Sequence, residues 1–489
     1  MRWTVEQVAG ALGVATPQGL DPLSRVAGFS IDSRTAKPGE LFFAIRGPRH
    51  DGHTFVEAVL AAGALAGAVA REHAAHYPVH VREKLFVVED TLAGLQQLAR
   101  SACRAWRNAQ PGRRLAAITG SAGKTTTKEI LAALLAARFR ILKSEGNLNN
   151  DYGLPLTLLR INEEDAIVVE LGMSRRGELA RLATIAEPDL GVVTNVAPVH
   201  LEFFSSIDEI ALAKRELIDG LTGPKAVAVL NADDARVARF ADGFRGRVLT
   251  YGVSPRAMFR AEKIIDRGAE GSSFEFVSPA GRARLELPLV GQHNVHNALA
   301  ALAAASEWGM GADEAQAVFA GLKPAAMRGE VLRFEEGFSV INDSYNSNPV
   351  ALDHMVDLLA ATPGYRRHLL AAGEMRELGP TSADLHREAG RHAAAKKIDW
   401  IVGVAGDAAE LIRSAVAAGH PATQAQFFPT SEEAATFLAA FIARGDLLLV
   451  KGSRGVRMER IVEALRATHR LGLAPQAREP VGAGKRERR

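Results

Sequence analysis

The chain contains a single cysteine, Cys103, among its 489 residues. One thiol excludes a disulfide framework and any zinc site built from several thiolates, so we expect a reducing compartment and a buried, apolar role for Cys103. The sequence also lacks a run of about 18 apolar residues, and residues 1–14 lack the apolar core of a signal peptide. We therefore expect a cytoplasmic protein with no membrane span.

A large excess of one charge is also absent. Lysine and arginine total 59, aspartate and glutamate total 56, and the net charge is +3. This balance is too even for a dedicated nucleic-acid binder. The apolar fraction of 47% and the charged fraction of 24% are ordinary for globular proteins, which excludes disordered, collagen-like and coiled-coil chains.

The length and the pattern of apolar runs indicate three domains of the α/β class. At about 150 residues per domain, a chain of this length is expected to form two to four domains. Short β-branched runs alternate with helical patterns, which is typical of parallel sheets covered on both faces. We predict an N-terminal α/β domain (1–110), a central parallel-sheet domain with a β-rich insertion (111–323), an open, Rossmann-like C-terminal α/β domain (324–468) and a disordered basic tail (469–489).

The sharpest local signal is the segment "LAAITGSAGKTTTKEILAALL", in which an apolar strand, a glycine-rich turn and a helix follow one another. Gly120 and Gly123 allow backbone N–H groups to face a phosphate, Lys124 can reach the β- and γ-oxygens, and Thr125 can bind a divalent cation. The loop is shorter than the usual motif, because Ile118 stands where a first glycine is expected. A plain strand-to-helix turn is the alternative, and we infer ATP or GTP binding.

Two further polar residues follow neighbouring strands of this domain. Glu170 ends the run "DAIVVEL", and His200 follows "TNVAPV". The carboxyl ends of parallel strands share one edge of a sheet, where ligands bind in open α/β folds. A carboxylate and an imidazole there can share one cation, although a lone histidine can equally be an ordinary loop or core residue.

A lysine interrupts the apolar face of the segment 207–221. Ile210 and Leu217 lie on this face, and the position between them is Lys214. In one interpretation the lysine stem is covered and its ammonium group reaches water. In the other, Lys214 points into the nucleotide site, where desolvation favours a neutral amine that is open to covalent modification.

The order of these motifs resembles that of a known family, the ATP-dependent Mur ligases of peptidoglycan synthesis together with folylpolyglutamate synthetase. The resemblance covers nearly the whole chain before the tail. It is carried by the segments "TGSAGKTTTKE", "EGNLNNDYGLPLTLL", "VVELGMSRRGEL", "TNVAPVHLEFFSSIDEIALAK", "VGQHNVHNALAALAA", "INDSYNSNPVAL", "AAGEMRELG" and "LVKGSRGVRMERI". Several of them look like the branch that adds D-alanyl-D-alanine, and the Asn-Pro-Arg signature of the branch that adds meso-diaminopimelate is absent.

The resemblance implies a site in each domain. ATP would contact Gly120, Ser121, Ala122, Gly123, Lys124, Thr125, Thr126, Asn294, Asn297, Arg328, Asp343 and Tyr345. Mg²⁺ would be bound by Thr125, Glu170, His200 and a carbamylated Lys214, so that Lys124, His200 and Lys214 carry the catalysis. The UDP substrate would contact Ser30, Asp32, Ser33, Arg34, Asn149 and Asn150, although residues 30–34 also fit an ordinary Asx-turn with a solvated arginine. The dipeptide would contact Asn346, Asn348, Glu374, Lys451, Ser453 and Arg454.

The implied reaction joins D-alanyl-D-alanine to UDP-N-acetylmuramoyl-tripeptide through an acyl phosphate, at the expense of ATP. Such an enzyme would serve cell-wall synthesis, and with it cell shape and division, and we expect it to be a monomer. Two alternatives stay open at this point. One is a different amino-acid-adding ligase of the family, such as a folylpolyglutamate synthetase, and the other is a P-loop ATPase that drives a conformational switch without ligation.

Overall fold

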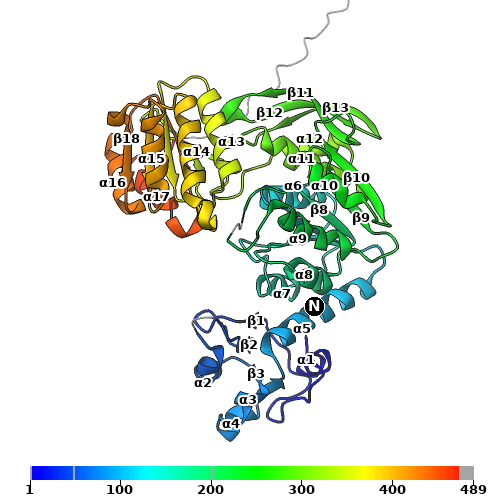
Figure 1. Cartoon of the computed structure of the whole chain (residues 1–489). Coiled ribbons are helices and arrows are strands. Elements are labelled where there is room, and N and C mark those ends of the chain that lie inside the picture. Colours follow the sequence, from blue (N-terminus) through cyan, green and yellow to red (C-terminus); the bar gives the residue numbers. More distant parts are fainter. Residues whose placement is uncertain (1–2, 48–49, 200–201, 473–489) are drawn as a thin grey trace, which may run out of the picture. The chain divides into compact units, whose positions relative to one another are not determined.

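A computed structural model of the protein describes all residues except 1–2, 48–49, 200–201 and 473–489 (Figure 1). The chain divides into two compact units, Met1–Lys323 and Pro324–Arg489. The first unit contains a four-stranded and a nine-stranded sheet, and the second contains a six-stranded sheet. Parallel pairing dominates all three sheets, which confirms the predicted α/β class.

The N-terminal sheet is parallel throughout, in the order β1-β2-β3-β4. Its strands are β1 (Phe29–Ser30), β2 (Leu41–Phe43), β3 (Ala66–Ala70) and β4 (Leu85–Val88). The helices of this part are α1 (Val5–Leu12), α2 (Val56–Ala61), α3 (Arg71–Ala74), α4 (Val79–Arg82) and α5 (Thr91–Ala109). Local sequence sets the helix ends: Thr4 and Gln7 form a capping box before α1, and Gly13 ends it in the left-handed conformation.

Helix α5 packs against the N-terminal sheet and against helices of the central domain. Its Trp106 Nε1 donates to the Glu164 carbonyl at 2.7 Å, and Arg100 and Arg104 both pair with Glu187. Cys103 on the same helix is buried, as expected, and burial raises the pKa of its thiol to about 12. The predicted domain boundary near residue 110 falls at the end of this helix.

The central sheet has the strand order β13-β12-β11-β10-β9-β8-β5-β7-β6. Its strands are β5 (Arg114–Thr119), β6 (Ile141–Lys143), β7 (Ala166–Glu170), β8 (Leu190–Val193), β9 (Val227–Asn231), β10 (Arg247–Gly252), β11 (Phe259–Asp266), β12 (Ser272–Ser278) and β13 (Gly281–Leu287). The predicted β-rich insertion exists, and it extends this sheet by a parallel β9–β10 pair and an antiparallel edge. Strand β11 has little apolar alternation after Ala261, so the sequence pattern did not indicate it.

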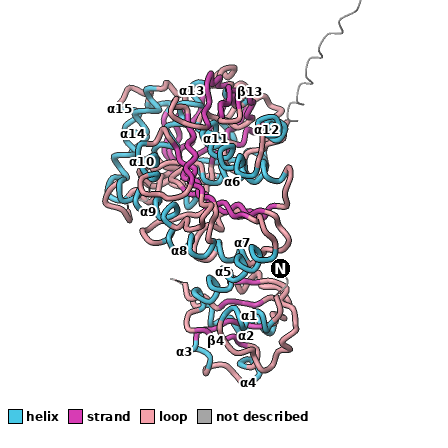
Figure 2. Tube along the Cα trace, turned by 90° about the vertical axis from the view of Figure 1, so that its right-hand side faces the viewer, coloured by secondary structure: helices cyan, strands magenta, loops and turns pink. Residues whose placement is uncertain are grey.

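Helices cover both faces of the central sheet (Figure 2). The helices are α6 (Lys124–Ala136), α7 (Gly153–Leu158), α8 (Glu178–Ala186), α9 (Ile207–Asp219), α10 (Ala235–Ala238), α11 (His293–Ala305) and α12 (Ala312–Phe319). Alternate residues of β5 point to opposite faces, so Ala116 and Ile118 pack with α6 and α11, while Leu115 and Ala117 join the core that contains α8 and α9.

The second unit has the strand order β14-β15-β19-β16-β17-β18, with only β14 antiparallel. Its strands are β14 (Glu330–Arg333), β15 (Ser339–Asp343), β16 (Arg367–Gly373), β17 (Trp400–Val404), β18 (Ala425–Phe428) and β19 (Asp446–Lys451). Its helices are α13 (Pro349–Ala361), α14 (Ser382–Ala395), α15 (Ala408–Ala417), α16 (Ser431–Phe441) and α17 (Glu459–Thr468). This is the open α/β arrangement that the sequence predicted.

The start of the predicted tail is structured. Leu471 forms a bridge with Phe334, and the Gly472 N–H donates to the Arg333 carbonyl at 2.8 Å. The prediction of disorder from residue 469 is therefore wrong for residues 469–472, whose backbone satisfies the open edge of β14. Residues 473–489 lie outside the described part of the chain.

None of the described helices has both the length and the apolar composition needed to cross a membrane.

Candidate active site

The phosphate loop connects β5 to α6, as predicted. Gly120 and Gly123 have φ angles of +144° and +82°. A Cβ on Gly120 would lie 1.7 Å from Thr194 Oγ1, and a Cβ on Gly123 would lie 2.2 Å from Asn297 Oδ1. Only glycine fits both positions, and the first turn of α6 then directs its N–H groups toward an anion.

The loop is held from the adjacent strand by a residue that the sequence interpretation missed. Asn195 follows β8, and its carbonyl and Oδ1 accept the N–H groups of Ser121 and Ala122 at 2.9 Å. Ser121 Oγ also donates to the Ala197 carbonyl at 3.1 Å. Ser121 and Ala122, which were predicted to contact ATP, therefore use these two N–H groups to shape the loop. The missed signal was a polar residue two positions after the buried strand β8, at the carboxyl edge of the sheet.

The lysine of the loop folds over it. Lys124 Nζ donates to the Gly120 carbonyl at 2.7 Å. Its ammonium group thus lies at the mouth of the turn, where it can reach a phosphate oxygen.

Thr125 and Glu170 come together at the carboxyl edge of the sheet, as predicted. Thr125 Oγ1 donates to Glu170 Oε2 at 2.7 Å, and the Asn149 amide donates to Glu170 Oε1 at 2.8 Å. Thr125 and Glu170 are buried. The carboxylate is thus fixed beside the first turn of α6 and offers hard oxygen ligands of the kind that Mg²⁺ prefers. Asn149, predicted to contact the UDP substrate, lies at this carboxylate.

Lys214 lies on the buried face of α9, with only 2% of its surface exposed. Burial lowers the pKa of its amine well below the ordinary value, and the nearby positive charge of Lys124 lowers it further. The interpretation in which the ammonium reaches water is therefore wrong. His200, the other predicted catalytic residue of this edge, lies outside the described residues.

The two asparagines of α11 bond to the protein itself. Asn294 Nδ2 donates to the Val290 carbonyl and Asn297 Nδ2 donates to Asn294 Oδ1, both at 2.8 Å. Thr127 Oγ1 donates to Asn297 Oδ1 at 3.4 Å. The bond from Thr127 ties α11 to α6 beside the phosphate loop, and the predicted adenine contact of both asparagines stays a prediction.

The predicted UDP-binding residues after β1 form a tight turn. Asp32 Oδ1 accepts the Arg34 N–H at 3.0 Å, and the Arg34 guanidinium binds both oxygens of the carboxylate. This pair lowers the pKa of Asp32 to about 2. Ser30 Oγ donates to the Asp32 carbonyl at 3.2 Å. The Asx-turn alternative is thus present, and the substrate role of residues 30–34 stays a prediction. Asn150 likewise caps the Tyr152 and Gly153 N–H groups.

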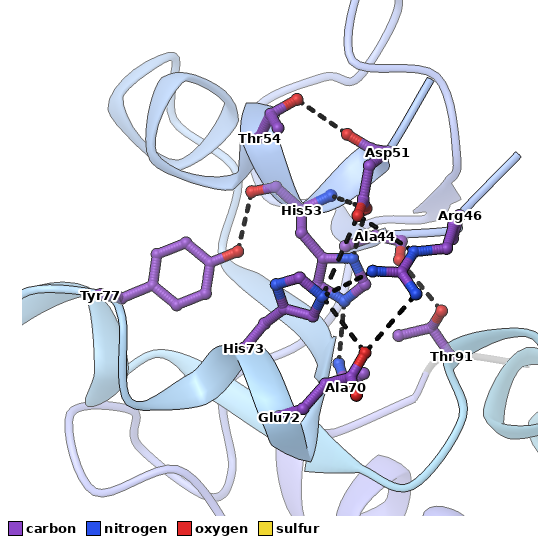
Figure 3. Close-up of polar contacts among 10 residues, drawn as sticks. All are labelled: Ala44, Arg46, Asp51, His53, Thr54, Ala70, Glu72, His73, Tyr77 and Thr91. Carbon is purple, nitrogen blue, oxygen red and sulfur yellow. Dashed lines mark hydrogen bonds and ion pairs between the residues drawn. The ribbon is translucent and has the colours of Figure 1, made fainter. Parts of the chain in front are cut away.

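Asp51, His53 and His73 gather near the carboxyl edge of the N-terminal sheet (Figure 3). His53 Nε2 accepts the Ala70 N–H at 3.0 Å, so its Nδ1 carries the proton and donates to Asp51 at 2.6 Å. The His53 and His73 rings stack at 3.9 Å with 16° between their planes, so their in-plane lone pairs do not converge on one ion. The cluster binds a loop and α3 to the sheet, and its geometry does not suit a metal.

The second unit gathers its predicted residues at the carboxyl edge of its own sheet. Lys451 Nζ donates to Asp343 Oδ2 at 2.5 Å and to the Asn346 carbonyl at 3.0 Å. This pair forms because β15 and β19 are neighbours in parallel register. The guanidinium carbon of Arg328 lies 4.1 Å from the centre of the Tyr345 ring.

Four more predicted residues lie at this edge or cap the helix that follows it. The Ser453 N–H donates to the Glu374 carbonyl at 3.1 Å, and Arg376, which the sequence interpretation missed, pairs with the Glu374 carboxylate at 3.1 Å. Arg454 lies 5.7 Å from the Tyr345 ring. Asn348 caps α13 through the Ala351 N–H.

Comparison with known proteins agrees with this geometry. Residues 25–102 match the Mur ligase family catalytic domain, residues 118–305 the Mur ligase middle domain, and residues 327–454 the Mur ligase glutamate ligase domain. The chain is 32% identical over 461 residues to the UDP-N-acetylmuramoyl-tripeptide–D-alanyl-D-alanine ligase of Bacillus subtilis, covering 94% of this chain and 96% of the relative.

Solved structures of MurF ligases are similar to this chain as well. A crystal structure of MurF from Acinetobacter baumannii superposes with a TM-score of 0.83 at 28% identity, over 96% of this chain and 99% of that one. The MurF ligase of Thermotoga maritima in complex with ADP gives 0.78 at 29% identity, over 91% and 98% of the two chains. With three matching domains and a relative that is similar over nearly its whole length, the chain belongs to the Mur ligase family.

Proposed function

We propose that the protein joins D-alanyl-D-alanine to UDP-N-acetylmuramoyl-tripeptide, with cleavage of ATP to ADP and phosphate, and so makes the pentapeptide precursor of peptidoglycan. The observation that carries the proposal is the phosphate loop with its buried Thr125–Glu170 pair, in a chain that aligns from end to end with ligases of this activity. Because ATP is the energy source, we expect the reaction to occur in the cytoplasm.

The chemistry explains why a phosphate loop is needed. A free carboxylate does not react with an amine until one oxygen becomes a leaving group. In the proposed reaction a carboxylate oxygen of the tripeptide attacks the γ-phosphorus of ATP, and the bond from that phosphorus to ADP breaks. The amine of D-alanyl-D-alanine then attacks the acyl carbon, loses a proton, and phosphate leaves with the electron pair of the C–O bond.

Both steps bring anions together, so the chain must supply positive charge and exact placement rather than a nucleophile. Lys124 and the first turn of α6 would hold the β- and γ-phosphates. Thr125 and Glu170 fit a magnesium ion, because a hydroxyl and a buried carboxylate meet there at 2.7 Å. When bound, Mg²⁺ would neutralise charge on the transferring phosphate.

Lys214 would complete this site as a carbamate. Desolvation and the charge of Lys124 lower the pKa of its buried amine and so favour the neutral form. A neutral amine attacks CO₂, a C–N bond forms, and loss of one proton leaves a carboxylate at the end of the side chain. That group would give α9 a negative charge where the site requires cation ligands.

The second unit would bind the ribose and phosphates of ATP and the incoming dipeptide. Arg328, Asp343 and Tyr345 are proposed for ATP, with the cation–ring pair of Arg328 and Tyr345 as a preformed surface. Lys451, Ser453 and Arg454 are proposed for the dipeptide, since Lys451 ends β19 and the other two follow it at the same sheet edge. In the first unit, residues 30–34 are proposed for the UDP group.

A substrate panel tests the proposal. ADP release is measured with ATP, UDP-N-acetylmuramoyl-tripeptides and a set of D,D-dipeptides. We expect sustained ADP release only when an acceptor and D-alanyl-D-alanine are both present. Turnover with a folate and glutamate would instead support the folylpolyglutamate branch, and ATP turnover without any acceptor would support an ATPase switch.

A further inference from the structure

Lys128 is a buried lysine that none of the steps above uses. It lies one helical turn after Lys124 on α6, and 1% of its surface is exposed. Burial of an ammonium group costs several kcal/mol unless the group is paired and hydrogen-bonded. The partners of Lys128 therefore indicate its role.

Two bonds satisfy this ammonium group. Lys128 Nζ donates to the Ser144 carbonyl at 2.7 Å and lies 2.8 Å from Glu129 Oε1. Glu129 also pairs with Lys143, whose side chain is 43% exposed. Burial alone would raise the pKa of Glu129, but its bonds to the two lysines lower it, so Glu129 stays ionised.

Ser144 connects Lys128 to Glu170 through hydrogen bonds. It directly follows β6 and is itself buried. Its N–H donates to the Val168 carbonyl at 3.2 Å, and its hydroxyl oxygen accepts the Glu170 N–H at 3.1 Å. The Ser144 carbonyl thus accepts a hydrogen bond from Lys128, and the Ser144 hydroxyl accepts one from the backbone of Glu170.

The same loop also forms a hydrogen bond to the side chain of Glu170. Asn149 donates from its amide to Glu170 Oε1, and its carbonyl accepts the Gly172 N–H, both at 2.8 Å. The loop 144–149 therefore holds Glu170 from two directions, and Lys128 fixes the loop where it begins.

We propose that Lys128 is a positioning residue that acts through Ser144 to aim the Glu170 carboxylate at Thr125, and so sets the affinity of this edge for a divalent cation. The inference rests on the proposed function, in which Thr125 and Glu170 bind Mg²⁺. Residues that orient metal ligands typically change metal affinity 10- to 100-fold when they are replaced. A role in packing alone would lower stability and leave cation affinity unchanged.

The test measures Mn²⁺ binding to the full chain in the presence of ADP, by the loss of the free Mn²⁺ signal in electron paramagnetic resonance. The variants are Lys128→Met and Ser144→Ala, with Ser144→Thr to restore the hydroxyl. Lys143→Met is the matched control, because it removes an ammonium from Glu129 without touching Ser144. Thermal unfolding of each variant is recorded in parallel.

We expect Lys128→Met and Ser144→Ala to raise the Mn²⁺ dissociation constant about 10-fold or more. Ser144→Thr and Lys143→Met should stay within about 2-fold of the natural chain. An unchanged Mn²⁺ affinity in folded Ser144→Ala would overturn the proposal. If Lys128→Met does not fold, the Mn²⁺ affinity of Ser144→Ala still tests the proposal.

Glu170→Gln separates this inference from the proposed function. If Glu170→Gln binds Mn²⁺ as tightly as the natural chain, the metal role of Glu170 fails. If Glu170→Gln loses Mn²⁺ while Ser144→Ala keeps it, the metal role stands and the role of Lys128 is refuted.

Discussion

Lys214 shows what a single residue adds to a helix pattern. The periodicity of α9 places Lys214 on the apolar face. Periodicity does not show how deeply a side chain is buried, so the sequence left open whether the ammonium group reaches water. The structure buries the side chain, and desolvation together with Lys124 lowers the pKa of its amine. A neutral amine at this position is what carbamylation requires.

We predict that Lys214→Ala lowers amide formation at least about 100-fold, because the cation site would lose the proposed carbamate. Added acetate or formate should restore part of the activity by occupying the vacated space. Binding of ¹³CO₂ gives a measurement independent of turnover: the natural chain should show a carbamate carbon signal in NMR that the variant lacks. Full activity of Lys214→Ala would refute the carbamate.

At the scale of elements, the phosphate loop could be predicted from one stretch of sequence, but its support could not. Strand, glycine turn and helix lie next to one another in the chain, so their pattern is local. Asn195 comes 72 residues after Gly123 and reaches the loop only because β8 pairs with β5. Such partners depend on strand order, which a local pattern does not contain.

The conformation of Gly123 gives a prediction for this element. Gly123→Ala places a Cβ 2.2 Å from Asn297 Oδ1 and adds the strain of a left-handed alanine, about 1–2 kcal/mol. We expect ADP affinity, measured by calorimetry, to fall about 10-fold or more. Gly177→Ala is the control, since Gly177 has a similar φ of +87° and no atom within 4 Å of the added Cβ. Equal ADP affinity in both variants would show that the close contact does not matter.

The histidine cluster of the N-terminal sheet gives a prediction about pH. Although burial alone would raise it, the pKa of Asp51 is lowered to about 2 by its bonds to His53 and Arg46. A depressed carboxylate pKa stabilises the fold above the unfolded value of about 3.9, and this contribution is lost as pH falls through 2.

Asp51→Asn should therefore cost local stability of about 1–2 kcal/mol at pH 7 and about half as much at pH 3. Hydrogen exchange of amides in β3 measures this loss of local stability, because the Ala70 N–H donates to His53. A loss that is the same at both pH values would mean that the ionised carboxylate of Asp51 contributes nothing to the stability of this sheet.

For the whole molecule, the sequence predicted the α/β class, the parallel central sheet and the open sheet of the second unit, because each rests on apolar runs of strand length. It did not indicate β11, whose outer half is polar, nor the pairing of Leu471 with Phe334 beyond the last helix. Among the proposed site residues, Thr125 could be predicted from the glycine-rich turn, and Glu170 and Lys214 could be predicted because each ends or breaks an apolar pattern. Arg376 carried no such signal.

The central claim is that ATP activates the carboxylate of the UDP-linked tripeptide by phosphoryl transfer. The most direct measurement uses tripeptide substrate labelled with ¹⁸O in its terminal carboxylate, with ATP and D-alanyl-D-alanine, and mass analysis of the phosphate released. The account predicts one ¹⁸O atom in each phosphate, because the C–O bond breaks when the amine attacks. Unlabelled phosphate, or label in AMP, would contradict it.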